Sequence, residues 1–147
     1  MIYLHLAMNS KLCTYINTFT NIFALVPIWK YIVKRDYIGT VLCSCSLVAS
    51  IGMHISETKH RLPGVHFKKY SNLLLNIDRF FAYVLFGYAV YKFFTKTVIP
   101  SLLEPVAMLG TAVVSVVIGE QTEDLTLYTV MHTIWHALSY GTLAYTI

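Results

Sequence analysis

Apolar residues follow one another along this chain in five long runs separated by short polar segments. The runs cover about residues 12–33, 37–55, 71–91, 97–119 and 125–147. An α-helix needs roughly 20 mostly apolar residues to cross a bilayer core about 30 Å thick, and each run is close to that length. The pattern therefore predicts an all-α fold, in which residues 1–147 form a single domain: a multi-spanning transmembrane bundle of about five helices.

The composition agrees with a membrane location. Hydrophobic residues make up 56% of the 147 residues, charged residues make up 12%, and the mean hydropathy is +0.61. Soluble domains carry about twice that charged fraction. The basic residues are scattered between the runs, so the chain has no basic patch with interleaved aromatics that would bind nucleic acid. We expect an integral, multi-pass membrane protein, and the sequence does not assign it to a particular membrane.

The first run is dotted with uncharged polar residues, which indicate a face turned toward other helices: Thr14, Asn17, Thr18, Thr20 and Asn21. Stronger signals lie in three other runs. The stretch SIGMH places Ser50 four residues before His54, NIDRF contains Asp78, and HTIWH contains the last pair, His132 and His136. A spacing of four puts both members of a pair on one helix face. Ionisable residues inside a span are costly, so they indicate a functional site.

Depth in the membrane gives an independent test of this interpretation. Asp78 and His132 each lie roughly 10 Å inside the same end of their runs, at about 1.5 Å per residue, and His54 lies near that end of its own run. Five antiparallel spans could have scattered these groups to opposite surfaces, but the sequence places them in one layer of the membrane. A zinc ion held by three histidines, with water as the fourth ligand, is a known catalytic arrangement. His54, His132 and His136 supply that number of ligands.

Each of these residues also has a simpler interpretation. A single intramembrane histidine can serve only to bond neighbouring helices, Ser50 can bond its own helix backbone, and Asp78 can pair with Arg79. Haem between facing histidines is a weaker alternative, because two of the histidines lie on one helix. Four other polar residues are expected to take no part in the site, most of them in the polar segment after the second run: Glu57, His60, His66 and Glu104.

The order Ser-x-x-x-His, then Asp, then His-x-x-x-His resembles a superfamily of membrane hydrolases and receptors. It includes alkaline ceramidases, progestin and adiponectin receptors with haemolysin III-like proteins, and Per1-like lipid remodelling proteins. The matching residues are Ser50, His54, Asp78, His132 and His136. The resemblance implies that the three histidines bind zinc, and that Asp78 and Ser50 orient the zinc-bound water for attack on a lipid. Members usually have seven spans, so this chain would be a reduced member with about five.

Two classes of function follow from these residues. The first is a zinc-dependent intramembrane hydrolase, ceramidase-like, that acts on the amide or ester of a membrane lipid with Asp78 and Ser50 as catalytic residues. The second is a non-catalytic membrane protein, receptor-like or structural, with zinc or a polar core between its helices. Because two helices of the family are missing, a homo-oligomer is a possible way to complete the walls of a lipid cavity.

Overall fold

The structure is a computed structural model that describes residues 9–95 and 101–147, and this part of the chain contains helices and no strand. The first rod is continuous and consists of α1 (Ser10–Phe19), the 3-10 segment η1 (Thr20–Ala24) and α2 (Leu25–Val33). The remaining elements are α3 (Tyr37–Ser56), η2 (Lys59–Arg61), η3 (Lys68–Tyr70), α4 (Ser71–Phe94), α5 (Leu103–Gln121) and α6 (Leu125–Thr146). The predicted all-α fold is confirmed.

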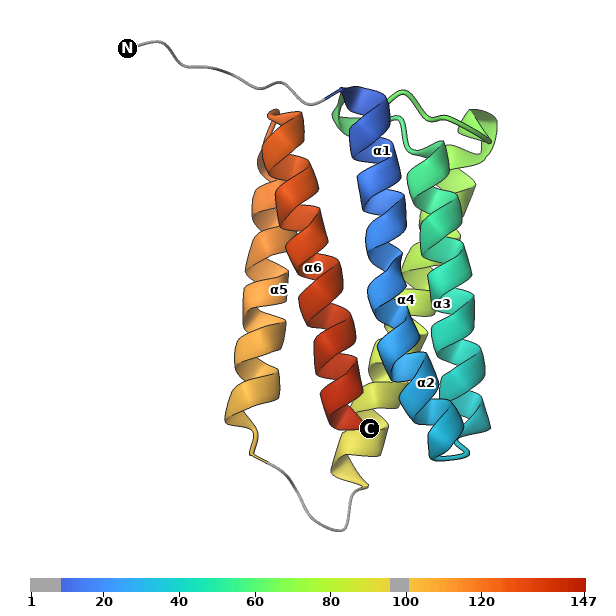
Figure 1. The fold of residues 1–147 in the computed structure, drawn as a ribbon, viewed down its shortest axis with the longest axis vertical. Helices are drawn as coiled ribbons and strands as arrows, with labels where there is room; N and C mark the ends of the chain where they lie inside the picture. The colour runs from blue at the N-terminus through green and yellow to red at the C-terminus, as the bar shows by residue number, and fades with distance from the viewer. Residues whose placement is uncertain (1–8, 96–100) are drawn as a thin grey trace.

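Four of the helical rods are long and apolar enough to cross a membrane: Ser10–Val33, Tyr37–Ser56, Lys68–Phe94 and Leu103–Gln121. The helix α6 has 22 residues and runs beside them over the same height (Figure 1), but its histidines, threonines and tyrosines make it more polar. The chain is therefore a multi-spanning transmembrane helix bundle, as predicted. α5 begins at Leu103, whereas the predicted run begins at 97, and residues 97–100 lie outside the described part.

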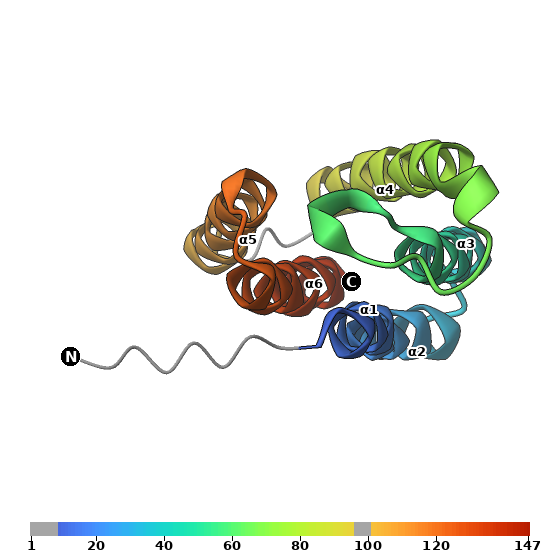
Figure 2. The ribbon, with the colours of Figure 1, turned by 90° about the horizontal axis from the view of Figure 1, so that it is seen from above.

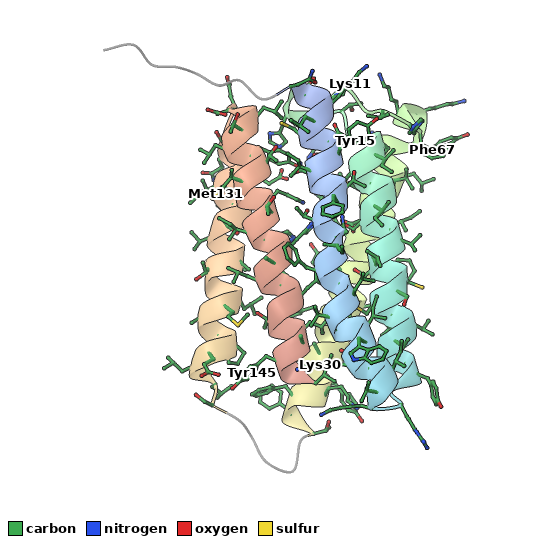
Figure 3. The ribbon with its side chains drawn as sticks, in the orientation of Figure 1. Lys11, Tyr15, Lys30, Phe67, Met131 and Tyr145 are labelled. Atoms are coloured by element: carbon green, nitrogen blue, oxygen red, sulfur yellow. The ribbon has the colours of Figure 1, made fainter. Side chains whose placement is uncertain are left out.

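The polar helix α6 lies between α5 and the other rods when the bundle is seen from above (Figure 2). It packs against α5 on one side and against the first rod and α4 on the other, while α3 packs against α4 and the first rod. We call side A the end near Lys11 and Phe67, and side B the end near Lys30 and Tyr145 (Figure 3). Both α1 and α6 run from side A to side B, so they are parallel (Figure 1).

The 3-10 segment in the first rod has a local cause. Pro27 lacks an N–H group, and its ring crowds the carbonyl four residues earlier, so a tighter turn precedes it. Polar side chains bond the backbone there: the Thr20 hydroxyl donates to the Asn17 carbonyl at 2.8 Å, and the Asn21 carboxamide donates to the same carbonyl at 3.3 Å. As the sequence indicates, the rod turns a polar face into the bundle, and its buried members are Thr14, Asn17, Thr20 and Asn21.

A compact turn at side B joins α2 to α3. The Asp36 N–H donates to the Tyr31 carbonyl at 2.9 Å and the Arg35 N–H donates to the Ile32 carbonyl at 3.0 Å, which is the pattern of a Schellman motif. Arg35 occupies the left-handed position of this motif, with φ 56°. The turn brings the Tyr31 ring onto Gly39, where a Cβ atom would lie 2.3 Å from the ring. Only glycine fits this close approach.

The Asp36 carboxylate ties three elements together at the same turn. It caps α3 by accepting a hydrogen bond from the Gly39 N–H at 3.0 Å, and it accepts another from the Tyr88 hydroxyl of α4 at 2.6 Å. The Lys92 ammonium lies 2.9 Å from its other oxygen. Burial alone would raise the pKa of Asp36, but the bonds from Tyr88 and Gly39 and the charge of Lys92 outweigh burial and lower that pKa.

The interior near side B is apolar. Its buried residues form one cluster that joins the first rod, α3, α4 and α6: Ala24, Tyr31, Cys43, Leu85, Ala89, Tyr140, Leu143 and Ile147. Cations satisfy carbonyls at the end of α6, because Lys30 donates to the Ala144 carbonyl at 2.8 Å and Lys34 donates to the Ile147 carbonyl. Positive charge is favourable at a helix C-terminus. This half of the bundle is closed by packing and by these caps.

Candidate metal centre

The three predicted histidine ligands lie together in the half of the interior nearest side A. One ring nitrogen of each of His54, His132 and His136 lies within 4.8 Å of the other two. The residues are 1%, 6% and 4% exposed, respectively. The closest approach joins Nε2 of His54 on α3 to Nε2 of His132 on α6, at 3.0 Å. The structure thus gathers nitrogen donors from two helices at one buried point.

The spacing of four on α6 explains how two of these rings reach the same point. The His132 and His136 ring centroids lie 4.6 Å apart, and they lie 4.5 Å and 5.2 Å, respectively, from the His54 ring. Residues one turn away on the same face of α6 are also buried: Tyr128, Thr129 and Tyr140. The polar positions that lower the hydropathy of α6 are therefore the ones that face the interior.

A threonine of the first rod fixes the tautomer of His136. The Thr20 hydroxyl lies 2.8 Å from Nδ1 of His136, and it also donates its only proton to the Asn17 carbonyl at 2.8 Å. Because a hydroxyl has one proton, the bond to His136 must use a proton on Nδ1. Nε2 of His136 is then unprotonated and free to bind a metal. Metal-binding histidines commonly have such a partner on the second nitrogen.

A glutamate fixes the tautomer of His54 in the same way. Nδ1 of His54 lies 3.3 Å from Oε2 of Glu57, and Oε1 of Glu57 accepts a hydrogen bond from the Tyr128 hydroxyl at 2.9 Å. A carboxylate only accepts hydrogen bonds, so Nδ1 carries the proton and Nε2 is the free donor atom. The contact between the Nε2 atoms of His54 and His132 then needs either a proton on Nε2 of His132, which donates to His54, or a metal ion bound by both nitrogens.

The expectation that Glu57 takes no part in the site is therefore wrong. Glu57 is only 6% exposed. It follows the last residue of α3 with extended backbone, at φ −60° and ψ 128°, and its N–H still donates to the His54 carbonyl at 3.4 Å. The chain thus folds the carboxylate back over the final turn of the helix. The signal was the spacing His-x-x-Glu at a helix end, where residues three apart are neighbours.

The other polar residues that were expected to take no part in the site divide into two groups. His66 and Glu104 are exposed, as expected, although the His66 N–H donates to the carbonyl of Ile55, next to His54, at 3.1 Å. His60 is half-buried: its ring stacks on the Tyr128 ring at 4.2 Å, and its Nε2 lies 3.7 Å from Glu120. His60 therefore covers the side A end of the cluster through the tyrosine that bonds Glu57.

The two predicted catalytic residues face each other across the contact between α3 and α4. Ser50 is 4% exposed and lies one turn before His54 on the same face of α3. Its hydroxyl and the side chain of His54 both lie close enough to the Asp78 carboxylate to interact with it electrostatically. Asp78 is half-buried, while its neighbour Arg79 is exposed. The structure thus brings all five predicted site residues to the same part of the bundle.

The donor set fits a small divalent ion. Three imidazoles converge, and partners hold the second nitrogen of two of them. Zinc binds histidine nitrogen at about 2.0–2.1 Å with tetrahedral geometry, which places its ligand nitrogens about 3.3 Å apart. The three nitrogens lie within 4.8 Å of one another here, so the rings would draw closer together around an ion. Haem fits less well, because its axial ligands approach a plane from opposite sides, whereas these nitrogens surround one point.

Comparisons of the chain with models of protein families, with curated proteins and with solved structures give no match. The resemblance to the ceramidase and receptor superfamily therefore rests on the five motif residues and their order alone.

Proposed function

We propose that this chain is a zinc-dependent hydrolase that cleaves an amide or ester bond of a membrane lipid. The observation that carries the proposal is the convergence of three buried histidine nitrogens beside an aspartate and a serine, inside a bundle that spans a membrane. Three histidines with an open fourth position form a common catalytic zinc site. Zinc supplies a Lewis acid for the substrate carbonyl and activates a water molecule when it is bound.

The residues of the chain have distinct tasks in this proposal. His54 and His136 would hold the ion through the nitrogens that Glu57 and Thr20 leave unprotonated, and His132 would supply the third nitrogen. Asp78 accepts the proton of the attacking water and delivers it to the leaving nitrogen or oxygen. The water oxygen adds to the carbonyl carbon, the C–N or C–O bond breaks, and the products are a carboxylic acid and an amine or alcohol. Ser50 holds the Asp78 carboxylate in place.

The position of the site suits a lipid. The cluster lies roughly 10 Å inside side A of the bundle, near the depth of a lipid's amide or ester carbonyl. Exposed lysines lie at the same end, in the connection between α3 and α4: Lys59, Lys68 and Lys69. Basic residues near a membrane surface attract anionic headgroups. A lipid anchored there would have its carbonyl at the height of the histidines.

Metal content and lipid turnover of the detergent-purified protein test the proposal. We expect about one zinc ion per chain in the wild type and none in His132→Ala. Asp78→Asn should keep the zinc and lose turnover of a fatty amide or ester by about 10²-fold to 10⁴-fold, the range for general acid–base catalysis. Wild-type protein without stoichiometric zinc, or an Asp78→Asn variant with unchanged turnover, would refute the proposed chemistry.

A non-catalytic role is the second candidate, and one observation favours it. The three histidines are almost completely buried and connect α3 to α6, two helices that pack mainly against other elements. A zinc ion there would hold the bundle together, as structural zinc sites do. In that case a chelator should unfold the protein, and no lipid should be hydrolysed.

A further inference from the structure

Asn17 on α1 has a buried side chain that bonds nothing. The residue is 0% exposed, and neither its Nδ2 nor its Oδ1 has a hydrogen-bond partner among residues 9–95 and 101–147. The great majority of buried polar groups in native proteins are paired. Asn21, one turn further along the same face, is 1% exposed and is paired: it donates to the carbonyls of Asn17 and Thr18 and accepts from Tyr140. The carboxamide of Asn17, with neither of its polar atoms bonded, therefore needs a partner.

The register between α1 and α6 places this carboxamide beside the histidine cluster. The two helices are parallel, and they meet at two heights: Cys13 and Tyr128 belong to one apolar cluster with Leu62, and Thr20 bonds His136. Asn17 lies between Cys13 and Thr20 on the buried face of α1, so it lies between these two contacts, at the height of the clustered rings. Seen from above, α1 and α4 flank the interior from opposite sides (Figure 2). Asn17 therefore approaches the site from the side opposite Asp78.

The chemistry of a carboxamide limits what can satisfy it. Whichever way the group is turned, one of its atoms needs a donor and the other needs an acceptor. An ester offers acceptors only. A secondary amide offers a donor as well, and in the usual trans form its N–H points away from its C=O. The carbonyl can therefore turn toward the histidine cluster while the N–H turns toward Asn17.

We propose that Asn17 makes the site selective for amide-linked lipids. Its Oδ1 accepts the N–H of the scissile amide, and its Nδ2 donates to a hydroxyl oxygen on the amine part of the lipid. This inference rests on the proposed function and narrows its substrate from an amide or ester to an amide. A site built to bond an N–H group rejects the analogue that lacks it, because a buried polar group is then left unpaired.

Lipid binding by the metal-free protein tests the inference without any hydrolysis. The probes are the hydroxyethyl amide and the hydroxyethyl ester of palmitic acid, which differ only in N–H against O, and calorimetry in detergent micelles gives their affinities. We expect chelator-treated wild type to bind the amide at least about tenfold more tightly than the ester. In Asn17→Leu the two affinities should differ by less than about twofold. Equal affinities in the wild type, or an unchanged ratio in Asn17→Leu, would overturn the inference.

A matched variant separates lipid recognition from a merely structural role. Asn17→Leu removes unpaired buried atoms and should unfold at the same temperature as wild type or higher, whereas Asn21→Leu removes a paired carboxamide and should unfold at a lower temperature. Asn21→Leu should nevertheless keep the amide preference. A less stable Asn17→Leu that keeps its amide preference would show that Asn17 is structural. If leucine prevents folding, Asn17→Ala gives the same comparison of affinities.

Turnover with zinc then distinguishes the two proposals. If neither lipid is hydrolysed but the amide preference in binding depends on Asn17, the proposed hydrolase fails and the selective site stands. If both lipids are hydrolysed and Asn17→Leu leaves the amide-to-ester ratio of turnover unchanged, the hydrolase stands and the role of Asn17 is refuted.

Discussion

The two halves of the bundle interior differ in chemistry, although the same helices build both. Near side A the buried residues are mostly polar, and they include Asn17, Ser50, His54, Glu57, His132 and His136. Near side B they are mostly apolar, and they include Ala24, Cys43, Leu85 and Leu143. Polar groups at membrane depth are costly unless they are bonded. The difference teaches that the side B half stabilises the bundle, while the side A half holds groups that a tightly packed core would exclude.

The largest expected effect is a difference between two substitutions on α6, one in each half of the interior. His136 and Leu143 lie seven residues apart on α6, two turns along the same face, and both are buried. His136→Ala removes a ligand and should weaken zinc binding by more than about a hundredfold, the upper range for loss of an outer partner. Leu143→Ala should keep the zinc but lose about 2–5 kcal/mol of stability. Zinc per chain and unfolding in detergent measure the two effects.

The reverse pattern would contradict the comparison. If Leu143→Ala lost its zinc at a temperature where it is still folded, the two halves would not be separate. If His136→Ala lost more stability than Leu143→Ala, the metal centre would be the main source of stability, as in the non-catalytic alternative.

The next effect concerns the partner of His54. Glu57→Gln keeps the shape of the side chain and the bond from Tyr128 but removes the negative charge that holds the proton on Nδ1. We expect zinc affinity to fall by about 10-fold to 100-fold, as for other outer partners of metal ligands. Competition with a chromophoric chelator measures the affinity. Glu104→Gln changes an exposed glutamate on α5 and serves as the control. Equal affinities in both variants would remove Glu57 from the site.

A glycine in the side B half should affect stability alone. A Cβ atom at Gly39 would lie 2.3 Å from the Tyr31 ring, whereas a Cβ at Gly87 would have nothing within 4 Å. Gly39→Ala should therefore cost about 1–3 kcal/mol through overpacking. Gly87→Ala, in the middle of α4, should be neutral or stabilise by up to about 1 kcal/mol. Thermal unfolding checks the two variants, and zinc content should be unchanged in both.

The Asp36 carboxylate predicts part of the acid sensitivity of the side B half. Its pKa is lowered in the folded protein because the bonds from Tyr88, Gly39 and Lys92 outweigh burial. A carboxyl with a lowered pKa stabilises the fold above its unfolded pKa of about 3.9, and this contribution is lost as the pH falls through the folded value. Asp36→Asn keeps the helix cap but removes the charge that pairs with Lys92, so it should cost up to about 1 kcal/mol at neutral pH and should lose less stability than wild type on acidification. Parallel pH profiles of the two proteins would contradict this.

The smallest effect comes from the turn between α2 and α3. Arg35 has φ 56° at a position where helices most often have glycine. Arg35→Gly should stabilise the protein by about 0.5–1 kcal/mol, because it removes the strain of the left-handed conformation. Lys34→Gly, one residue earlier, should destabilise it, since Lys34 is not in that conformation and bonds the Ile147 carbonyl. Unfolding measurements that rank the two variants in the opposite order would refute the assignment of the left-handed position to Arg35.

Much of the fold was predictable because it depends on local patterns. The runs of apolar residues gave the rods, and the spacing of four in His132 and His136 placed both rings on one face. The start of α5 was less predictable, because apolar residues before Leu103 extend the run without extending the helix in the described part. The polar face of the first rod was also foreseen, since uncharged polar residues at membrane depth need other helices as partners.

The remaining parts of the site depend on the register between helices, which local patterns do not contain. Thr20 meets His136 across 116 positions of sequence, and no spacing within α1 or α6 indicates that contact. Glu57 was misjudged for a different reason. It lies in a polar segment that looks solvent-exposed, but the backbone turns at the end of α3 and buries its carboxylate against His54.

The helix α5 has a consequence for how the sequence can vary. It packs mainly against α6, through a narrow face of small buried residues: Pro105, Ala112, Ser115 and Gly119. None of the residues assigned to the metal centre lies on it. Its main role is to return the chain from side B to side A, because α4 ends at side B and α6 must start from side A to run parallel to α1 (Figure 1). The outward positions of α5 should therefore tolerate almost any apolar side chain without loss of the metal centre.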